Sequence, residues 1–308
     1  MNNYSVSYNF PNDFLWGINL SDNILRKRED ISVLYRIKDK SIQGVCLTLE
    51  WADFEPLKNN FEENLIESTR SLLSRIRSHN LEPILIINTA TVPQWQNLEH
   101  NTKNYFFSSE KYNFVSYLSN AFVPYTNYFG LCISDTAFLS NKETKSELET
   151  VQNIREHIIS IKNSSKIGIV LSSQIFNNNL RGFRGMIQSS NIRLLKESSA
   201  DFFGISADGT IYNMLQNIFK DERKPLFILN DKMNSNTNSN NFEDLADKIF
   251  DMWHFYQKGW QILGYFTELN IYNEHVFEFF SKTCRNNSLS ISSTDENLSE
   301  KWMHFLKD

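Results

Sequence analysis

The sequence predicts one α/β domain, a (β/α)8 (TIM) barrel, from three observations. Short apolar runs alternate with longer amphipathic stretches along most of the 308 residues, the pattern of parallel strands separated by helices. The clearest run, 224–231, enters on Pro225, continues through four apolar residues and ends in Asn230 and Asp231. Such a run is typical of a strand buried on both faces, whose polar end reaches the carboxyl edge of the sheet. No internal repeat or linker divides residues 1–308, so a single domain is expected.

Eight strands and the helices between them account for this alternation. The strands are expected at 14–17, 44–51, 83–88, 129–135, 166–173, 201–206, 224–231 and 262–269. The helices are expected at 22–40 (in part), 61–78, 110–122, 142–162, 192–197, 211–219, 242–258 and 274–284, with a short one around Trp302. The helix at 61–78 shows the basis of these assignments, because Leu65, Leu72 and Ile76 recur at helical spacing between charged residues.

Composition excludes several classes of protein. The chain is 41% hydrophobic, carries a formal net charge of −5 and has no basic stripe, so nucleic acid is not an expected partner. It has neither a long apolar membrane-spanning run nor the apolar core of a secretory signal at residues 1–9, so a cytoplasmic protein without a membrane partner is expected. Cys46 and Cys132 lie in apolar runs, where buried reduced thiols are expected. No metal, phosphate or cofactor motif is present, and no pattern indicates the oligomeric state.

Six segments carry more information than periodicity does. They are 10–17 (FPNDFLWG), 50–56 (EWADFEP), 81–95, 201–204 (DFFG), 224–225 (KP) and 264–266 (GYF). In this order they resemble the motifs of family 1 glycoside hydrolases, the β-glucosidase-like barrels. The resemblance runs from residue 10 to about residue 275 and implies the barrel fold with a sugar site at its mouth. Trp16, Trp51 and Trp95 lie in these motifs, where packing is the expected role.

The catalytic positions that the resemblance implies are altered. A retaining glycosidase uses two carboxyl groups about 5–5.5 Å apart, one as acid/base and one as nucleophile. The family's acid/base glutamate, in its TxNEP segment, aligns with Thr136, and its nucleophile, in ITENG, aligns with Asn230. A hydroxyl cannot protonate a leaving glycosidic oxygen at neutral pH, and an amide cannot form the glycosyl ester. The resemblance therefore predicts a divergent barrel without ordinary retaining β-glycosidase activity.

Positions that bind the sugar in the family are altered as well. The family's glutamine aligns with Ile24 and its histidine with Thr89. Its aromatic pair aligns with Ala207 and Asp208, and its tryptophan aligns with Glu268. The chain also looks shorter than its relatives, which predicts trimmed loops at the barrel mouth. Together these changes indicate a different ligand, or binding without catalysis.

Polar side chains nevertheless end the predicted strands. This expected ring contains Glu50, Asn88, Asp135, Ser173, Asp208, Asn230, Asp231, Glu268 and Asn270. Taken singly, each is compatible with ordinary solvation at a strand end. Glu50 and Glu268 directly follow long apolar runs, so both are expected to be only partly solvated. Asp135 and Asp231 each lie one residue from an altered catalytic position. These four carboxylates are the candidate catalytic groups, and the candidate ligand-binding residues are Asn88, Thr89, Thr136, Asp208, Asn230 and Asn270.

Two functions stay open on the sequence alone. The first is a degenerate barrel that binds a small polar or carbohydrate-like ligand at its mouth without retaining β-glycosidase activity. The second is an enzyme of non-standard chemistry, an unusual glycoside hydrolase or a small-molecule biosynthetic enzyme, that uses the four candidate carboxylates. A closed polar pocket in which two carboxylates converge would favour the enzyme, whereas a collapsed or flat mouth would favour the binding protein.

Overall fold

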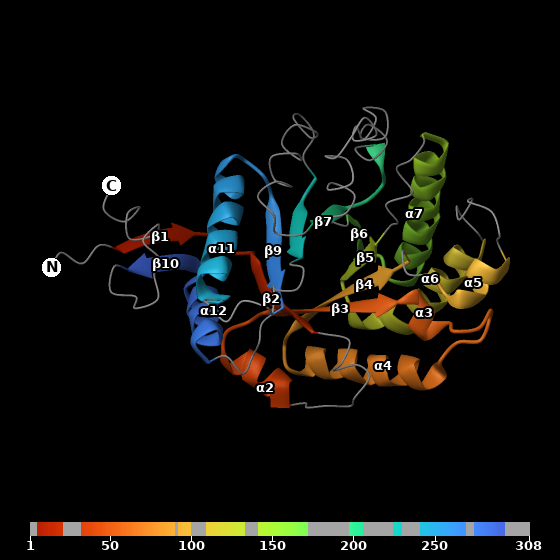
Figure 1. The fold of residues 1–308 in the computed structure, drawn as a ribbon, viewed down its shortest axis with the longest axis horizontal. Coiled ribbons are helices and arrows are strands. Elements are labelled where there is room, and N and C mark those ends of the chain that lie inside the picture. The colour runs from red at the N-terminus through yellow and green to blue at the C-terminus, as the bar shows by residue number, and fades with distance from the viewer. Residues whose placement is uncertain are drawn as a thin grey trace.

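The computed structural model describes residues 5–20, 32–89, 92–99, 109–132, 141–171, 197–205, 224–229, 241–268 and 274–292. Within these ranges the chain forms a closed parallel barrel in which each strand pairs with the next one along the sequence, and the last closes on the first (Figure 1). The strands are β2 (Leu15–Leu20), β3 (Gly44–Glu50), β4 (Glu82–Asn88), β5 (Tyr128–Cys132), β6 (Lys166–Val170), β7 (Phe202–Ile205), β8 (Leu226–Leu229) and β9 (Ile262–Thr267). The predicted (β/α)8 barrel is confirmed, and each strand begins within two residues of its expected position.

Helices cover the outside of the barrel (Figure 1). They are α2 (Ser32–Asp39), α3 (Trp51–Phe54), α4 (Glu63–Ser78), α5 (Gln94–Glu99), α6 (Ser109–Phe122), the 3₁₀ turn η1 (Val123–Tyr125), α7 (Asn141–Ile161), α11 (Asn241–Gln257) and α12 (Glu274–Asn286). The five longest predicted helices that these ranges include are confirmed to within two residues. The helices expected at 192–197 (except its last residue), at 211–219 and around Trp302 lie outside the described residues. None of the helices described is both long and apolar enough to cross a membrane.

Aromatic side chains fill much of the interior of the barrel. The rings of Phe202 and Phe227 meet edge to face with centroids 5.1 Å apart, and Phe266 lies 5.9 Å from Phe227. Glycines on neighbouring strands make room for these rings. A Cβ atom on Gly168 would lie 2.1 Å from the Phe202 ring, and one on Gly17 would lie 2.1 Å from the Phe266 ring. The barrel interior is therefore a packed core, and a ligand can approach only from an end.

A two-stranded antiparallel sheet lies outside the barrel, and the sequence patterns do not predict it. It joins β1 (Ser5–Asn9) to β10 (Ser288–Ser292), segments from opposite ends of the described chain (Figure 1). Tyr8 anchors this sheet on α11, because its ring lies 5.2 Å from the Phe250 ring and 4.6 Å from the Trp253 ring. The contact buries Tyr8 almost completely and fixes the sheet against the helical layer.

Asn287, in the turn between α12 and β10, ties the amino-terminal motif to the end of α12. Its Nδ2 donates to the carbonyl oxygens of Phe10 (3.0 Å) and Pro11 (2.8 Å), and its Oδ1 accepts from Nε1 of Trp16 at 2.8 Å. The backbone φ of 48° is in the left-handed region, which asparagine tolerates better than most residues. Trp16 is fully buried, so the expectation that this tryptophan packs is confirmed.

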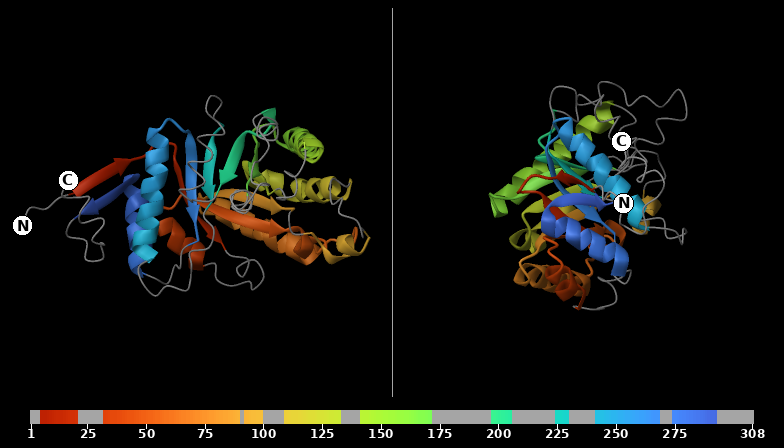
Figure 2. Two further views of the ribbon diagram at one scale, coloured as in Figure 1. Left: turned by 45° about the horizontal axis from the view of Figure 1, so that its top comes forward. Right: turned by 90° about the vertical axis from the view of Figure 1, so that its left-hand side faces the viewer.

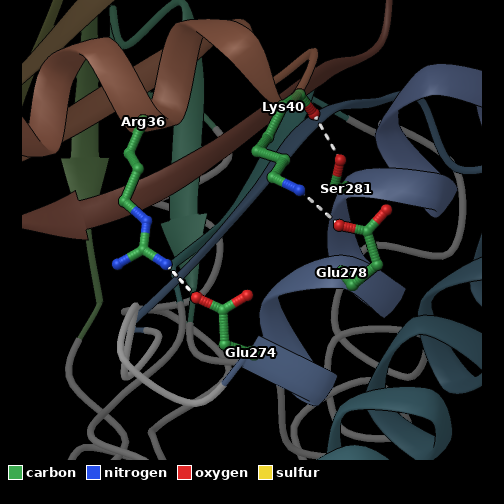
Figure 3. A network of polar contacts seen from close by, with 5 residues as sticks. All are labelled: Arg36, Lys40, Glu274, Glu278 and Ser281. Atoms are coloured by element: carbon green, nitrogen blue, oxygen red, sulfur yellow. Dashed lines mark hydrogen bonds and ion pairs between the residues drawn. The ribbon is translucent and has the colours of Figure 1, made fainter.

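Polar contacts join α12 to α2 and the residue that follows it, at the seam where the barrel closes (Figure 3). Arg36 pairs with Glu274, Lys40 pairs with Glu278, and the carbonyl of Lys40 accepts a hydrogen bond from Ser281 Oγ at 3.0 Å. The hydrogen bond from Lys40 lowers the pKa of the Glu278 carboxyl. The pair is exposed and contributes less than about 1 kcal/mol. Its contribution is present above the ordinary carboxyl pKa and is lost as pH falls through the lowered pKa.

Candidate functional site

Glu50 and Asn88 lie side by side at the carboxyl ends of β3 and β4. The two residues are partners in the sheet register, and Asn88 Nδ2 donates to Glu50 Oε2 at 2.8 Å. Cys46 on β3 and Ile86 on β4 belong to the apolar cluster inside the barrel. Because side chains alternate between the two faces of a strand, Glu50 and Asn88 share that inner face and point into the barrel mouth. Both are half-buried, as the sequence predicts for Glu50.

Cys132 continues this row onto the next strand. It is the register partner of Asn88, and its side chain packs against the interior cluster while staying partly exposed. None of the three cysteines of the chain forms a disulfide. Burial raises the pKa of the Cys46 thiol, which fits the expected inert core residue. The expectation of full burial is wrong for Cys132, because β5 ends there and its side chain reaches the mouth.

Thr89 is a predicted ligand-binding residue that the structure places in a buried contact between two strand ends, and its ligand-binding role stays a prediction. It follows Asn88 directly and is 3% exposed. Its Oγ1 donates to the carbonyl oxygen of Cys132 at 3.0 Å, and its backbone N–H donates to the same oxygen at 3.3 Å. Thr89 therefore ties the end of β4 to the end of β5 and holds Asn88 in place.

Glu268 lies on the same rim as Glu50. It follows β9 directly and is half-buried. It lies two residues after Phe266, which faces the barrel interior, so the alternation of side chains along a strand places it on the same face. β9 pairs with β2, and β2 pairs with β3, so two strand spacings separate the two carboxylates around the rim. Their predicted position at one end of the barrel is confirmed. The remaining predicted site residues, Asp135, Thr136, Ser173, Asp208, Asn230, Asp231 and Asn270, lie outside the described residues, and their roles stay predictions.

The opposite wall of the mouth is apolar. Val170 on β6 and Leu229 on β8 both pack against the interior cluster, on either side of Gly204. A Cβ atom on Gly204 would lie 2.8 Å from Leu229 Cδ1 and 3.0 Å from Val170 Cγ2. These two side chains therefore flank the space that the glycine leaves. In the described residues, the mouth has a polar wall on β3 and β4 and an apolar wall on β6 and β8.

The motif residues near the mouth have structural roles. The Glu55 carboxylate accepts from Trp51 Nε1 at 2.8 Å and from the backbone N–H of Asn59 at 2.8 Å, and its carbonyl accepts from Trp95 Nε1 at 2.9 Å. Glu55 is 3% exposed, and both tryptophans are buried. The motif at 50–56 therefore builds a rigid support for the chain that leaves β3 just after Glu50.

Other motif residues stabilise the amino end of the barrel, away from the mouth. Asp201 accepts from the backbone N–H of Ile167 at 2.9 Å and from Arg155 at 3.1 Å. Lys224 Nζ donates to the carbonyl oxygen of Ala200 at 2.8 Å. These contacts join consecutive strands at their starts, so the motifs at 201–204 and 224–225 report on the fold and not on the chemistry of the site.

A second glutamate–asparagine pair lies at that amino end. Glu82 is half-buried at the start of β4, and its carboxylate accepts from Nδ2 of Asn127 at 3.2 Å. Burial raises the pKa of the Glu82 carboxyl, against the hydrogen bonds from Asn127 that lower it. The pair resembles Glu50 and Asn88 in composition and burial but lies at the other end of the barrel, which makes it a matched control for the mouth.

Comparison with known proteins identifies the fold. No sequence-family model and no curated protein matches the chain. Among solved structures, β-glycosidase BGL167 is 11% identical with a TM-score of 0.67, over 90% of this chain and 97% of that one. A β-glucosidase from Thermotoga maritima in complex with deoxynojirimycin is 13% identical with a TM-score of 0.65, over 91% and 99%. The family 1 β-glucosidase from Thermotoga maritima gives 13% identity and a TM-score of 0.63 over the same shares. Since identities this low show the fold alone, the chain has the barrel fold of the family 1 β-glucosidases, as its motifs predict.

Proposed function

We propose that this chain binds a small polar, carbohydrate-like ligand at the carboxyl end of its barrel, without ordinary retaining β-glycosidase activity. The observation that carries the proposal is the division of the mouth into two walls. Glu50 and Asn88 offer hydrogen-bonding groups on one side, and Val170 and Leu229 offer an apolar surface on the other. A sugar-like ring has hydroxyl groups at its edge and C–H groups on its faces, so it can satisfy both walls at once.

The absence of standard hydrolysis is supported by the sequence at the two catalytic positions. The resemblance to family 1 places Thr136 and Asn230 where that reaction needs two carboxyl groups. The ligand class is supported by the solved β-glucosidase complex, in which a protein of this fold holds deoxynojirimycin, a polyhydroxylated ring. Loss of the two carboxylates removes the chemistry without removing the polar wall on β3 and β4.

Glu50 is the residue from which we expect the largest contribution to binding. A carboxylate accepts charge-assisted hydrogen bonds, which are about twice as strong as those between neutral groups. Asn88 donates to one oxygen of the carboxylate and so fixes its orientation before a ligand arrives. Such preorganisation lowers the cost of ordering the side chain on binding.

Replacing Glu50 with glutamine is expected to weaken ligand binding about tenfold, because a hydrogen bond to a charged group contributes about 1.5–3 kcal/mol. Thermal-shift screening against monosaccharides, deoxynojirimycin, nucleosides and amino acids selects the ligand, and isothermal titration calorimetry then compares the variants. Glu82→Gln is the matched control and should bind as the wild type does. Equal losses in Glu50→Gln and Glu82→Gln, or no shift with any polyhydroxylated ring, would contradict the proposal.

A further inference from the structure

The sheet of β1 and β10 has an outer edge that is formed by β1. In Figures 1 and 2, β10 lies between β1 and α12, so β1 carries the outer edge of the sheet in the part of the chain that the structure describes. The five register pairs from Ser5–Ser292 to Asn9–Ser288 run without a bulge. Because an outer strand turns alternate N–H and C=O groups away from its neighbour, β1 is a template for a further strand.

In the residues that the structure describes, the side chains of this edge supply none of the usual protection against pairing. Natural edge strands are blunted by lysine, proline, inward-pointing charges or bulges. The sequence of β1, SVSYN, has no charged residue and no proline, and β10, SLSIS, has none either. Ser7 is exposed in the middle of β1, with its Oγ 3.2 Å from Ser290 Oγ. Within the described residues, the edge is therefore electrically neutral along the whole length of β1.

We propose that β1 pairs antiparallel with β1 of a second copy of this chain, across a two-fold axis at Ser7. The strand pattern is symmetric about that residue, since positions 5, 7 and 9 are polar and positions 6 and 8 are apolar. Antiparallel self-pairing centred on Ser7 places apolar positions opposite apolar positions and polar opposite polar. It brings no like charges together, and the two-fold arrangement closes on itself as a dimer.

The resulting interface would be a continuous four-stranded sheet in the order β10, β1, β1 and β10. Two five-residue strands form only a small contact, at the low end of the size range of specific interfaces. The dimer is therefore a weak one, to be sought by sedimentation equilibrium over protein concentrations from about 1 µM to about 1 mM. This proposal does not depend on the function of the barrel mouth.

Ser7→Lys tests the proposal. In the dimer the two lysines at position 7 would have Cβ atoms about 5 Å apart, directly opposite one another, where like charges repel. The dissociation constant should rise about fivefold at low salt, and added salt should reverse the change. Ser290→Lys is the control. It removes the same contact between Ser7 and Ser290, but it puts the two new charges about 14 Å apart, three strand spacings, where they are largely screened.

A charge-pair experiment separates repulsion from misfolding. Ser7→Asp alone should also weaken the dimer, whereas an equimolar mixture of Ser7→Asp and Ser7→Lys should form a heterodimer tighter than either homodimer. Unchanged melting temperatures show that the variants fold. The proposal is overturned if the wild type stays monomeric across the concentration range, if Ser7→Lys and Ser290→Lys weaken association equally, or if the mixture gains nothing.

Discussion

Asn287→Ala is expected to lower the free energy of unfolding by about 3 kcal/mol, a large fraction of the stability of a single domain. Alanine leaves Nε1 of Trp16 without its acceptor inside the core, a penalty of about 1–3 kcal/mol. It also removes the two hydrogen bonds to the carbonyl oxygens of Phe10 and Pro11. Finally, it must adopt a φ of 48°, which costs about 1 kcal/mol more for alanine than for glycine. Urea denaturation measures the total.

Two further variants separate these contributions. Asn287→Gly accepts the backbone conformation and loses only the side-chain bonds, so it should be about 1 kcal/mol more stable than Asn287→Ala. Asn287→Asp keeps an acceptor for Trp16 but turns an unprotonated carboxylate oxygen toward the carbonyl oxygens of Phe10 and Pro11, so it should be less stable than the wild type although Trp16 keeps its partner. If all three variants unfold at the wild-type urea concentration, the tie between the amino-terminal motif and α12 has no energetic importance.

Gly17→Ala is expected to destabilise the barrel by about 3 kcal/mol, at the upper end of the usual cost of overpacking. The added Cβ atom would lie 2.1 Å from the Phe266 ring and 2.8 Å from the backbone oxygen of Gly44. The ring is fully buried against Phe227 and has little room to move, and the backbone oxygen belongs to a neighbouring barrel strand. Thermal unfolding followed by circular dichroism measures the loss.

A double-mutant cycle with Phe266→Leu identifies the source of that strain. The smaller side chain relieves the contact with the ring, so Gly17→Ala should cost less in the Phe266→Leu background than in the wild type. The contact with the Gly44 oxygen stays, so the rescue should be partial. Additive effects of the two substitutions would show that the ring does not limit this position.

Much of the fold could be predicted from the sequence because the barrel strands are buried on both faces. Apolar runs such as 83–88 and 226–229 allow few other assignments, and the alternation with helices then fixes the topology. The sheet of β1 and β10 could not be predicted in the same way. Each of its strands has five residues of alternating polar and apolar type, and neither is stable without the other. Their partners lie at opposite ends of the described chain, where local patterns carry no information on pairing.

The candidate site was less accessible to prediction, for a physical reason. The motifs that reveal the fold, including Glu55, Asp201 and Lys224, have structural roles in this barrel. Strand-end polarity indicated Glu50 as a candidate, but it could not separate Asn88, which is bonded to Glu50, from Thr89, which is bonded to β5. The apolar wall was missed because a valine or a leucine near a strand end looks like ordinary core. Counting every second residue outward from the buried interior of each strand identifies the side chains that face the mouth, and so identifies both walls.

The rate at which the purified chain hydrolyses aryl β-glucosides and β-galactosides tests the central claim most directly. That claim is a ligand-binding barrel from which both carboxyl groups of the retaining mechanism have been lost. We predict no turnover above that of a heat-inactivated sample, including at concentrations where a sugar-like ligand protects the protein against thermal unfolding. Robust turnover that is abolished by Asp135→Asn or Asp231→Asn would contradict the account, because it would show that neighbouring carboxylates have taken over the catalytic roles.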